Sequence, residues 1–197
     1  MISTRLRLLF AALMIPLLMT ATSMSMAAEQ APRVRLETTM GNIVLELDRE
    51  RAPTTVDNFL TYVNDGFYDG TIFHRVIDGF MIQGGGYTAD LSRKETRRSI
   101  KNEADNGLKN AHGSIAMART SDPHSASAQF FINVADNAML DYKAPNGRGW
   151  GYAVFGRVAE GMEVVDKIRT QTTGVHAGFR DVPKKTITIT RAVVETP

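Results

Sequence analysis

Short runs of alternating apolar and polar residues restrict the fold of this chain more than any other feature. The first two runs cover residues 33–37 and 43–48, and the turn-like stretch Thr39-Met40-Gly41-Asn42 separates them. Successive side chains of a strand point to opposite faces, so these runs predict a hairpin with one buried face. Further strand-like runs follow at residues 71–77, 80–83, 114–118, 129–134, 152–158 and 186–190.

Two segments instead repeat their apolar residues at helical spacing. In the first, proline at 53 suits the first turn of a helix and Gly66 suits its C-terminal stop. The second is a short amphipathic segment at residues 162–168. Because the strands are not regularly interleaved with helices, a doubly wound parallel sheet is disfavoured. The pattern predicts a mainly β chain, an antiparallel sheet or barrel capped by two helices.

Two glycine-containing motifs are assigned to turns and strand ends. Asp78-Gly79, between two strand-like runs, is a dipeptide favoured in two-residue hairpin turns. Gly84-Gly85-Gly86 lacks both the spacing and the strand–loop–helix context of a phosphate-binding loop. We therefore expect a second hairpin, followed by a bulge or strand end.

The run at residues 71–77 places one strongly charged residue among large apolar ones. Strict alternation puts Phe73, Arg75 and Ile77 on one face of this strand and His74 on the other. On this strand alone, Arg75 could equally be a surface arginine whose stem packs on an apolar neighbour. His74 is interpreted as a structural residue and not as a general acid or base.

The first 27 residues have the organisation of an export leader. Arg5 and Arg7 precede an apolar run at residues 8–18, and Ser25-Met26-Ala27 has the small-x-small pattern of a cleavage site. The apolar run is shorter than the about 20 residues that a membrane-spanning helix needs. We therefore expect a cleavable signal peptide, export and no stable membrane association after cleavage.

Cleavage after Ala27, with Ala28 as a second possible end, leaves 170 of the 197 residues. No repeat, low-complexity tract or linker divides residues 28–197, so a single domain is expected. The chain has 23 Lys and Arg against 21 Asp and Glu, and removal of Arg5 and Arg7 leaves 21 of each. Without a basic excess, a nucleic-acid partner is not expected.

The chain has no cysteine, which excludes disulfides, thiolate zinc sites, iron–sulfur clusters and a cysteine nucleophile. Its four histidines do not have the spacing of metal ligands. Ser114 lies near His112 in the sequence, but no nucleophile-elbow motif surrounds it. Neither a metal site nor hydrolase chemistry is predicted.

One segment closely resembles the signature of the cyclophilin peptidyl-prolyl cis-trans isomerases: Phe73-His74-Arg75-Val76-Ile77-Asp78-Gly79-Phe80-Met81-Ile82-Gln83-Gly84-Gly85. Further matches follow in the family's order, namely Met117-Ala118, Gln129-Phe130-Phe131-Ile132, Leu140-Asp141 and Val154-Phe155-Gly156. The resemblance covers residues 33–194 and, with the leader, is closest to the periplasmic cyclophilins of Gram-negative bacteria. It implies a closed eight-stranded antiparallel β-barrel capped by two α-helices, and an enzyme that needs no cofactor.

The resemblance also implies the residues of the site. Arg75 matches the catalytic arginine, and Gln83 matches the polar residue beside it. The walls of the proline pocket are matched by Phe80, Met81, Phe131 and Leu140, other substrate contacts by Ala118, Gln129 and Tyr152, and backbone pairing with the substrate by Arg119. Met139 stands where many eukaryotic members have tryptophan, so weak cyclosporin binding is expected.

The implied substrates are unfolded or partly folded protein chains that contain proline, bound by a monomer. Two other readings use the same residues. A proline-binding chaperone module would use the same groove without turnover, and from spacing alone the apolar wall residues could be ordinary barrel core. A third alternative is a barrel that holds a small ligand, although the interior of a small barrel is often filled by side chains.

Overall fold

The structure is a computed structural model that describes residues 30–147 and 149–195. Its strands are β1 (Arg33–Thr38), β2 (Gly41–Leu47), β3 (Phe73–Ile77), β4 (Met81–Gly84), β5 (Ser114–Met117), β6 (Phe130–Asn133), β7 (Val154–Glu160), β8 (Thr173–His176), β9 (Phe179–Pro183) and β10 (Ile189–Glu195). Its α-helices are α1 (Pro53–Asn64) and α2 (Met162–Arg169), with short 3₁₀ helices at Ala104–Asn106 and Ala138–Leu140. The prediction of a mainly β chain with two α-helices is confirmed.

The leader predicted at residues 1–27 lies outside the described residues, so the leader and the domain start at residue 28 stay predictions. In the part of the chain that the structure describes, no helix is long and apolar enough to cross a membrane.

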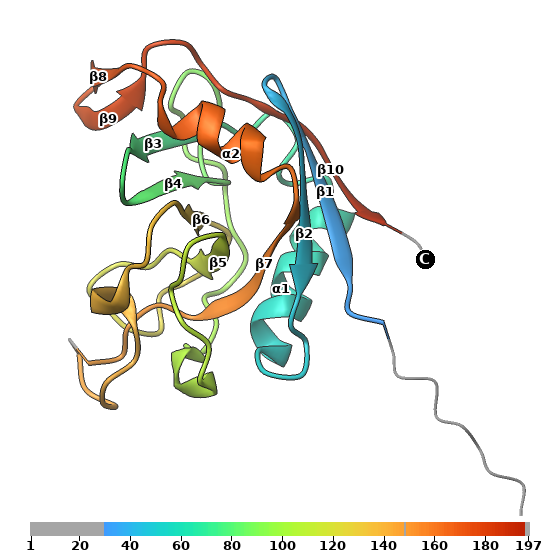
Figure 1. Cartoon of the computed structure of the whole chain (residues 1–197), viewed down its shortest axis with the longest axis vertical. Helices are drawn as coiled ribbons and strands as arrows, with labels where there is room; N and C mark the ends of the chain where they lie inside the picture. Colours follow the sequence, from blue (N-terminus) through green and yellow to red (C-terminus); the bar gives the residue numbers. More distant parts are fainter. Residues whose placement is uncertain (1–29, 148, 196–197) are drawn as a thin grey trace, which may run out of the picture.

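Eight strands form one strongly curled antiparallel sheet in the order β10-β1-β2-β7-β5-β6-β4-β3 (Figure 1). The first hairpin, β1–β2, is confirmed, but its turn contains only Thr39 and Met40 of the four predicted residues, because Gly41 and Asn42 already pair within the strands. The remaining strands, β8 and β9, form a separate two-stranded sheet that lies against β3.

The sheet is not a fully closed barrel, so that part of the prediction is too strong. Its edges meet around one isolated bridge, Ile72 to Thr188, in which Phe73 N–H donates to Ile187 O at 2.9 Å and Ile189 N–H donates to Thr71 O at 2.8 Å. Beside this bridge, Gly70 N–H donates to Ile189 O at 2.8 Å. Further along, β3 lies against β9 of the small sheet instead of continuing a ladder with β10.

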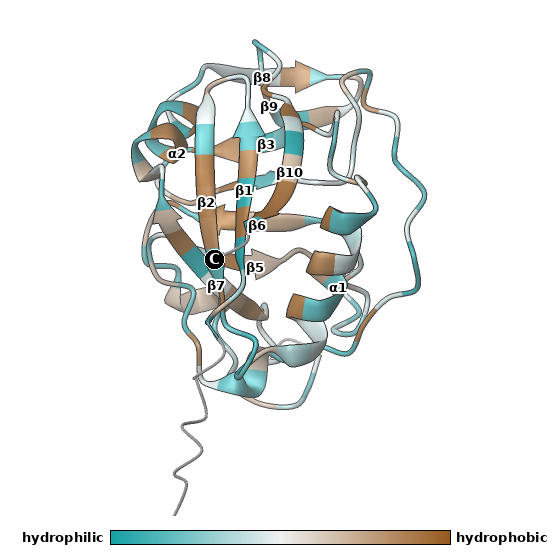
Figure 2. Cartoon of the chain, turned by 90° about the vertical axis from the view of Figure 1, so that its right-hand side faces the viewer, coloured by the Kyte–Doolittle hydropathy of each residue, from teal (hydrophilic) through white to brown (hydrophobic). Residues whose placement is uncertain are grey.

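Two apolar clusters lie on opposite faces of the same strands. The inner cluster fills the curled sheet and includes residues of both helices; its largest buried side chains are Phe59, Tyr62, Tyr68, Phe73, Phe130 and Phe155. The outer cluster contains the buried residues Met81, Ala116, Phe131 and Val154. Figure 2 shows the hydrophobic residues gathered along the strands, with hydrophilic residues in the connecting loops. Because successive strand residues face opposite ways, one strand supplies both clusters.

The N-terminus of α1 is capped by a residue that is distant in the sequence. Its N-cap residue, Ala52, forms no side-chain cap hydrogen bond. Instead, the Glu103 carboxylate accepts hydrogen bonds from Thr54 N–H at 3.1 Å and from Thr55 N–H at 2.8 Å. A carboxylate at this position satisfies free N–H groups and interacts favourably with the helix dipole. Glu103 therefore ties the irregular segment before β5 to the helix that packs on the inner cluster.

The β3–β4 hairpin has a longer loop than the predicted two residues. Ile77 pairs with Met81, so residues 78–80 all lie in the loop. Phe80 N–H donates to Ile77 O at 3.1 Å, and Gly79 has a φ of +71°. Asp78 and Gly79 are thus the central residues of the β-turn, but Phe80 also leaves the ladder.

A β-bulge at His74 changes the faces of β3. Phe73 pairs with Gly84 and Arg75 pairs with Gln83, so two steps along β3 match one step along β4. As a result Phe73 joins the inner cluster, whereas Ile77 packs against the outer one. The prediction that Phe73 shares the face of Arg75 is wrong, because the extra residue interrupts the alternation.

The C-terminal strand also differs from its prediction. The strand expected at residues 186–190 is displaced to β10, which pairs with β1 along its length. The preceding residues only touch the β3 edge, through Ile187 and Thr188. Neither β8 nor β9 was predicted, since the residues of these short strands show no alternation of apolar and polar side chains.

Candidate active site

One row of residues crosses five neighbouring strands on the face opposite the inner cluster. Arg75 of β3 pairs with Gln83 of β4, and Gln83 pairs with Phe131 of β6. Phe131 then pairs with Ala116 of β5, and Ala116 with Val154 of β7. Residues directly opposite one another in a sheet share a face, so the arginine and the glutamine lie in line with the outer cluster.

The predicted wall residues come together in this outer cluster. Met81 and Phe131 are among its buried members, and the partly buried side chains packed against it include Phe80, Ala118, Leu140 and Tyr152. None of these six belongs to the inner cluster. Their interpretation as ordinary barrel core therefore fails, because the core and this wall are separate surfaces of the sheet.

Two glutamines form the polar side of the site. Gln83 Nε2 donates to Gln129 Oε1 at 3.1 Å, and Gln129 O accepts a hydrogen bond from Ala118 N–H at 2.9 Å. A Cβ at Gly86 would come within 2.4 Å of Gln129 Cγ, so a glycine is required where the glutamine side chain passes. Gly84 ends β4, which confirms the strand-end prediction for the glycine run.

Arg119 is held by its side chain at the far end of the cluster. Its Nε donates to Gly151 O at 2.8 Å, and its guanidinium carbon lies 4.5 Å from the centre of the Tyr152 ring. The Tyr152 ring in turn meets the Phe131 ring edge to face, with centroids 5.6 Å apart. These contacts fix the tyrosine that stands at one of the predicted substrate positions.

Arg75 lies at the opposite end of the site, with 41% of its side chain exposed. Its Nε is 3.7 Å from Asp181 Oδ2, which makes an ion pair with the small β8–β9 sheet. Asp181 was not predicted as a site residue, because nothing in the sequence indicated that β9 lies beside β3.

A network of buried asparagines supports the loops of the outer cluster, and it was also missed. Asn137 Nδ2 donates to Phe80 O at 2.8 Å and to Asn133 Oδ1 at 2.7 Å. Asn137 N–H donates to Asn110 O at 2.8 Å, and Asn110 N–H donates to Asp141 Oδ1 at 2.8 Å. The network thus holds the loop of Phe80 and the residue that follows Leu140. Asn133 within the apolar strand β6 is the one signal that sequence reasoning could have used.

His74 is buried, in agreement with a structural role, and its ring lies 4.6 Å from that of Tyr87. Burial is the main cause that lowers the pKa of His74 to about 4, and the nearby Arg75 charge lowers it further. A hydrogen bond with the backbone of Ile72 acts in the opposite direction. The imidazole is therefore neutral near pH 7, and its Nδ1 has no hydrogen-bond partner in the described part of the chain.

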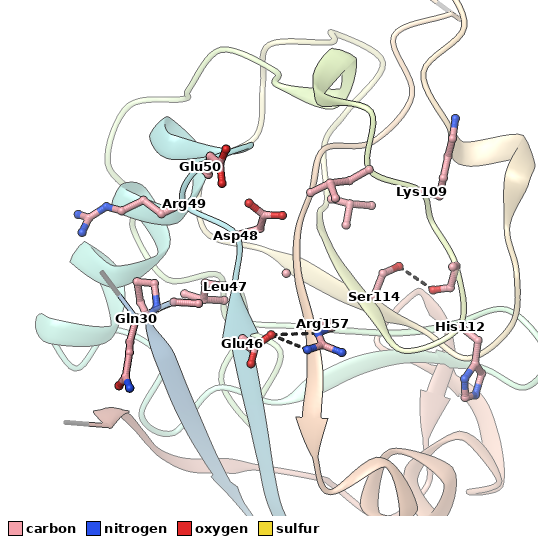
Figure 3. A pocket seen from close by; sticks show the side chains of 16 residues that line it. Gln30, Glu46, Leu47, Asp48, Arg49, Glu50, Lys109, His112, Ser114 and Arg157 are labelled. Carbon is pink, nitrogen blue, oxygen red and sulfur yellow. Dashed lines mark hydrogen bonds and ion pairs between the residues drawn. The ribbon is translucent and has the colours of Figure 1, made fainter. Parts of the chain in front are cut away.

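A hollow of about 670 Å³ lies elsewhere, between the ends of β2 and β7 and residues 108–114 (Figure 3). Charged and apolar residues line it, and Arg157 of β7 donates to Glu46, its partner in β2, at 2.6 Å (Figure 3). None of the ten predicted site residues lines it. The space inside the curled sheet is filled by the inner cluster, which argues against a ligand-holding barrel. Within residues 30–147 and 149–195, no group of three or more His, Asp or Glu could hold a metal ion.

Comparison with known proteins gives a consistent result. Residues 33–194 match the family model described as cyclophilin type peptidyl-prolyl cis-trans isomerase. Peptidyl-prolyl cis-trans isomerase A of Dickeya dadantii is 53% identical over 186 residues, which are 94% of this chain and 96% of that protein. Peptidyl-prolyl cis-trans isomerase B of Escherichia coli is 53% identical over 161 residues, which are 82% of this chain and 98% of that protein.

Solved structures agree with the fold. A cyclophilin type peptidyl-prolyl cis-trans isomerase from Cryptosporidium parvum aligns with a TM-score of 0.69 at 26% identity, covering 85% of this chain and 99% of that chain. The same protein in the presence of the dipeptide Ala-Pro aligns with a TM-score of 0.68 at 27% identity, covering 84% and 99%. From the family match, the relatives and the curled sheet with two helices, the chain belongs to the cyclophilin type peptidyl-prolyl cis-trans isomerases.

Proposed function

We propose that this enzyme isomerises X–Pro bonds by binding the twisted amide more tightly than either planar form, with Arg75 as the catalytic residue. Rotation about a peptide bond is opposed by amide resonance, with a barrier of about 18–20 kcal/mol. The two X–Pro isomers differ by only about 0.5–1 kcal/mol. No bond is broken, so the reaction requires selective stabilisation of the transition state and no nucleophile.

The observation that carries the proposal is the position of Arg75, in line with Gln83 and Phe131 on the outer face. When the C–N bond twists, the prolyl nitrogen loses its conjugation and gains a lone pair that can accept a hydrogen bond. A guanidinium N–H donates to that nitrogen chiefly in the twisted state, so this bond lowers the barrier instead of merely tightening binding. Arginine suits the task better than lysine, because it stays charged when partly desolvated and presents several donors in a fixed plane.

The outer cluster supplies the grip on the proline ring. Met81 and Phe131 are buried in it, while Phe80 and Leu140 stay partly exposed at its edge. An apolar surface of this kind holds the pyrrolidine ring and excludes water, which strengthens the interaction of Arg75 with the substrate.

The polar residues act on the substrate chain around the proline. Gln83 and Gln129, joined by a hydrogen bond, orient the guanidinium or the substrate carbonyl. Ala118 and Tyr152 contact the substrate, and the backbone of Arg119 pairs with its chain.

The substrates in this proposal are unfolded or partly folded chains that contain proline, and the site of action is the periplasm. The C. parvum protein was crystallised in the presence of Ala-Pro, which supports a prolyl peptide as ligand. Export rests on the leader pattern of the first 27 residues. Intact-mass analysis of the protein recovered from the periplasm of an expressing cell tests it, and retention of the full chain in the cytoplasm would contradict it.

The function is tested with a cis-to-trans rate assay on an X–Pro peptide at low temperature. We expect Arg75→Ala to lower kcat/KM by about 10²–10³, a loss comparable to removal of an oxyanion-hole donor. Arg157→Ala is the matched control, since this exposed arginine also pairs with a carboxylate but lies on the hollow of Figure 3.

Two results would contradict the proposal. Full activity in a folded Arg75→Ala variant would remove the assigned role of the arginine. A folded wild-type protein that binds prolyl peptides without accelerating isomerisation would favour the chaperone module.

A further inference from the structure

We propose that Asp181 is a positioning residue for Arg75, holding the Nε side of the guanidinium so that its other N–H groups face the substrate. This inference rests on the proposed function of Arg75 and adds a residue outside the cyclophilin signature segment. Asp181 lies on β9, in the small sheet that the sequence did not predict.

The contact comes from a separate structural unit. Asp181 Oδ2 is 3.7 Å from Arg75 Nε, and each side chain is 41% exposed. Among the described residues, Asp181 is the carboxylate that forms an ion pair with Arg75. At 3.7 Å the contact is an ion pair and not a short hydrogen bond, so it acts on Arg75 through charge and leaves the N–H donors of the guanidinium free.

The β8–β9 hairpin is anchored beside Arg75 by aromatic side chains. The Phe179 ring meets the Tyr87 ring with centroids 5.2 Å apart, and Tyr87 lies 4.6 Å from the His74 ring. His74 directly precedes Arg75 in β3. The neighbours of Asp181 on its C-terminal side, Val182 and Pro183, are buried. The carboxylate is thus carried by a segment packed against the same strand that carries the arginine.

The backbone of Asp181 is irregular, because the residue lies where the pairing of β8 and β9 shifts register. Its φ is +60°, in the left-handed region that glycine adopts most easily. Aspartate and asparagine tolerate this region better than other non-glycine residues. Asp181 thus occupies a position that glycine would adopt with less strain. Its carboxylate lies beside the guanidinium of Arg75.

The ion pair of Arg75 and Asp181 contributes little to the stability of the fold. Exposed pairs typically contribute less than about 1 kcal/mol, and salt screens them. Its role is better explained by the orientation of the Arg75 guanidinium. Arginine has a long flexible stem, and an N–H donor acts only when it points at the developing lone pair of the prolyl nitrogen. A carboxylate on one edge of the guanidinium restricts that motion and leaves the opposite edge free.

The decisive variant is Asp181→Asn, which keeps a residue tolerant of positive φ and removes the charge. We expect kcat for an X–Pro peptide to fall about five- to tenfold, with KM and the thermal unfolding midpoint unchanged. Raising the salt concentration should lower kcat of the wild type toward that of the variant, while the variant itself changes little. Asp78→Asn is the matched control, since Asp78 is an exposed carboxylate in the adjacent hairpin loop that pairs with Arg169 instead.

A double-mutant cycle separates positioning from a general structural role. In an Arg75→Ala background, Asp181→Asn should have no further effect on kcat. Asp181→Gly provides a second variant with the preferred backbone conformation, and it should lose activity like Asp181→Asn.

The inference is overturned if both Asp181 variants keep kcat within twofold of the wild type, or if the loss persists undiminished in the Arg75→Ala background. These outcomes differ from failure of the proposed function, which would show as full activity of Arg75→Ala alone.

Discussion

The inner and outer apolar clusters are built from the same strands but differ in what covers them. The inner cluster is covered by α1 and α2, whose apolar faces pack into the curled sheet. The outer cluster is covered by irregular segments around Leu108, Leu140 and Tyr152. Regular elements bury one face completely, whereas loops leave the other face partly open. The inner face thus carries the main apolar core, and the outer face of the same sheet carries the site that we propose for the substrate.

The loops of the outer cluster are joined by a network of buried asparagine side chains. Asn133 and Asn137 join the loop of Phe80 to the segment before Leu140. Buried polar groups are costly when a partner is removed, so a satisfied network fixes the shape of the loops. On the outer face this network sets the positions of the loops around the apolar residues.

The largest expected effect comes from two consecutive residues that point to opposite faces. Phe130 lies among the rings of Phe59, Tyr68 and Phe73, at centroid distances of 5.7, 5.6 and 6.2 Å. We expect Phe130→Ala to lower the free energy of unfolding by about 3–5 kcal/mol, the usual range for a buried phenylalanine. Urea denaturation of the purified variant measures it.

The companion change, Phe131→Ala, should affect kcat/KM more and the free energy of unfolding less. We expect a smaller loss of stability than for Phe130→Ala, because the outer cluster is thinner, and a fall of about 10–100-fold in kcat/KM from the lost contact with the proline ring. If Phe130→Ala reduced kcat/KM as much as Phe131→Ala at a temperature where both are folded, the division between the two faces would not hold.

A second prediction concerns the bulge that separates the faces of β3. The pKa of His74 is lowered to about 4 by its burial, below the ordinary value of 6.5. Between these two pH values the unfolded chain binds a proton that the folded protein does not, so stability falls as pH decreases from 6.5 toward 4. The shift corresponds to about 3 kcal/mol over this interval.

This prediction is checked by comparing urea denaturation at pH 7 and at pH 4.5 for the wild type and for His74→Gln. The variant should lose less stability on acidification, whatever its stability at pH 7. Equal losses of unfolding free energy in the two proteins would show that protonation of the buried His74 does not cause the fall in stability.

The smallest expected effect tests the helical cover of the inner cluster. Glu103→Ala removes the carboxylate that accepts from Thr54 and Thr55 at the start of α1. We expect the free energy of unfolding to fall by about 1 kcal/mol, as for loss of an N-cap, with kcat/KM unchanged. Lys101→Ala, an exposed change nearby, is the control for thermal unfolding. Unchanged stability of the Glu103 variant would show that the helix does not depend on this distant cap.

Much of the fold could be predicted from local patterns. The β1–β2 hairpin, α1 and α2 follow from period-two and helical spacing together with proline, glycine and turn residues, all of which act over a few residues. Six residues that the family resemblance implied for the site all lie in the outer cluster, and their role in binding substrate stays a prediction. Spacing alone could not separate them from Phe130 and its neighbours, since alternation does not say which face is outside.

The sequence by itself determined the class of fold, the family and the set of candidate site residues, because these depend on local periodicity and on motifs. Only the tertiary structure decided that the sheet stays slightly open, that His74 forms a bulge and that Asp181 reaches Arg75. Each of these depends on contacts between segments far apart in the chain. Such contacts are set by how the whole sheet curls, and no short stretch of sequence contains that information.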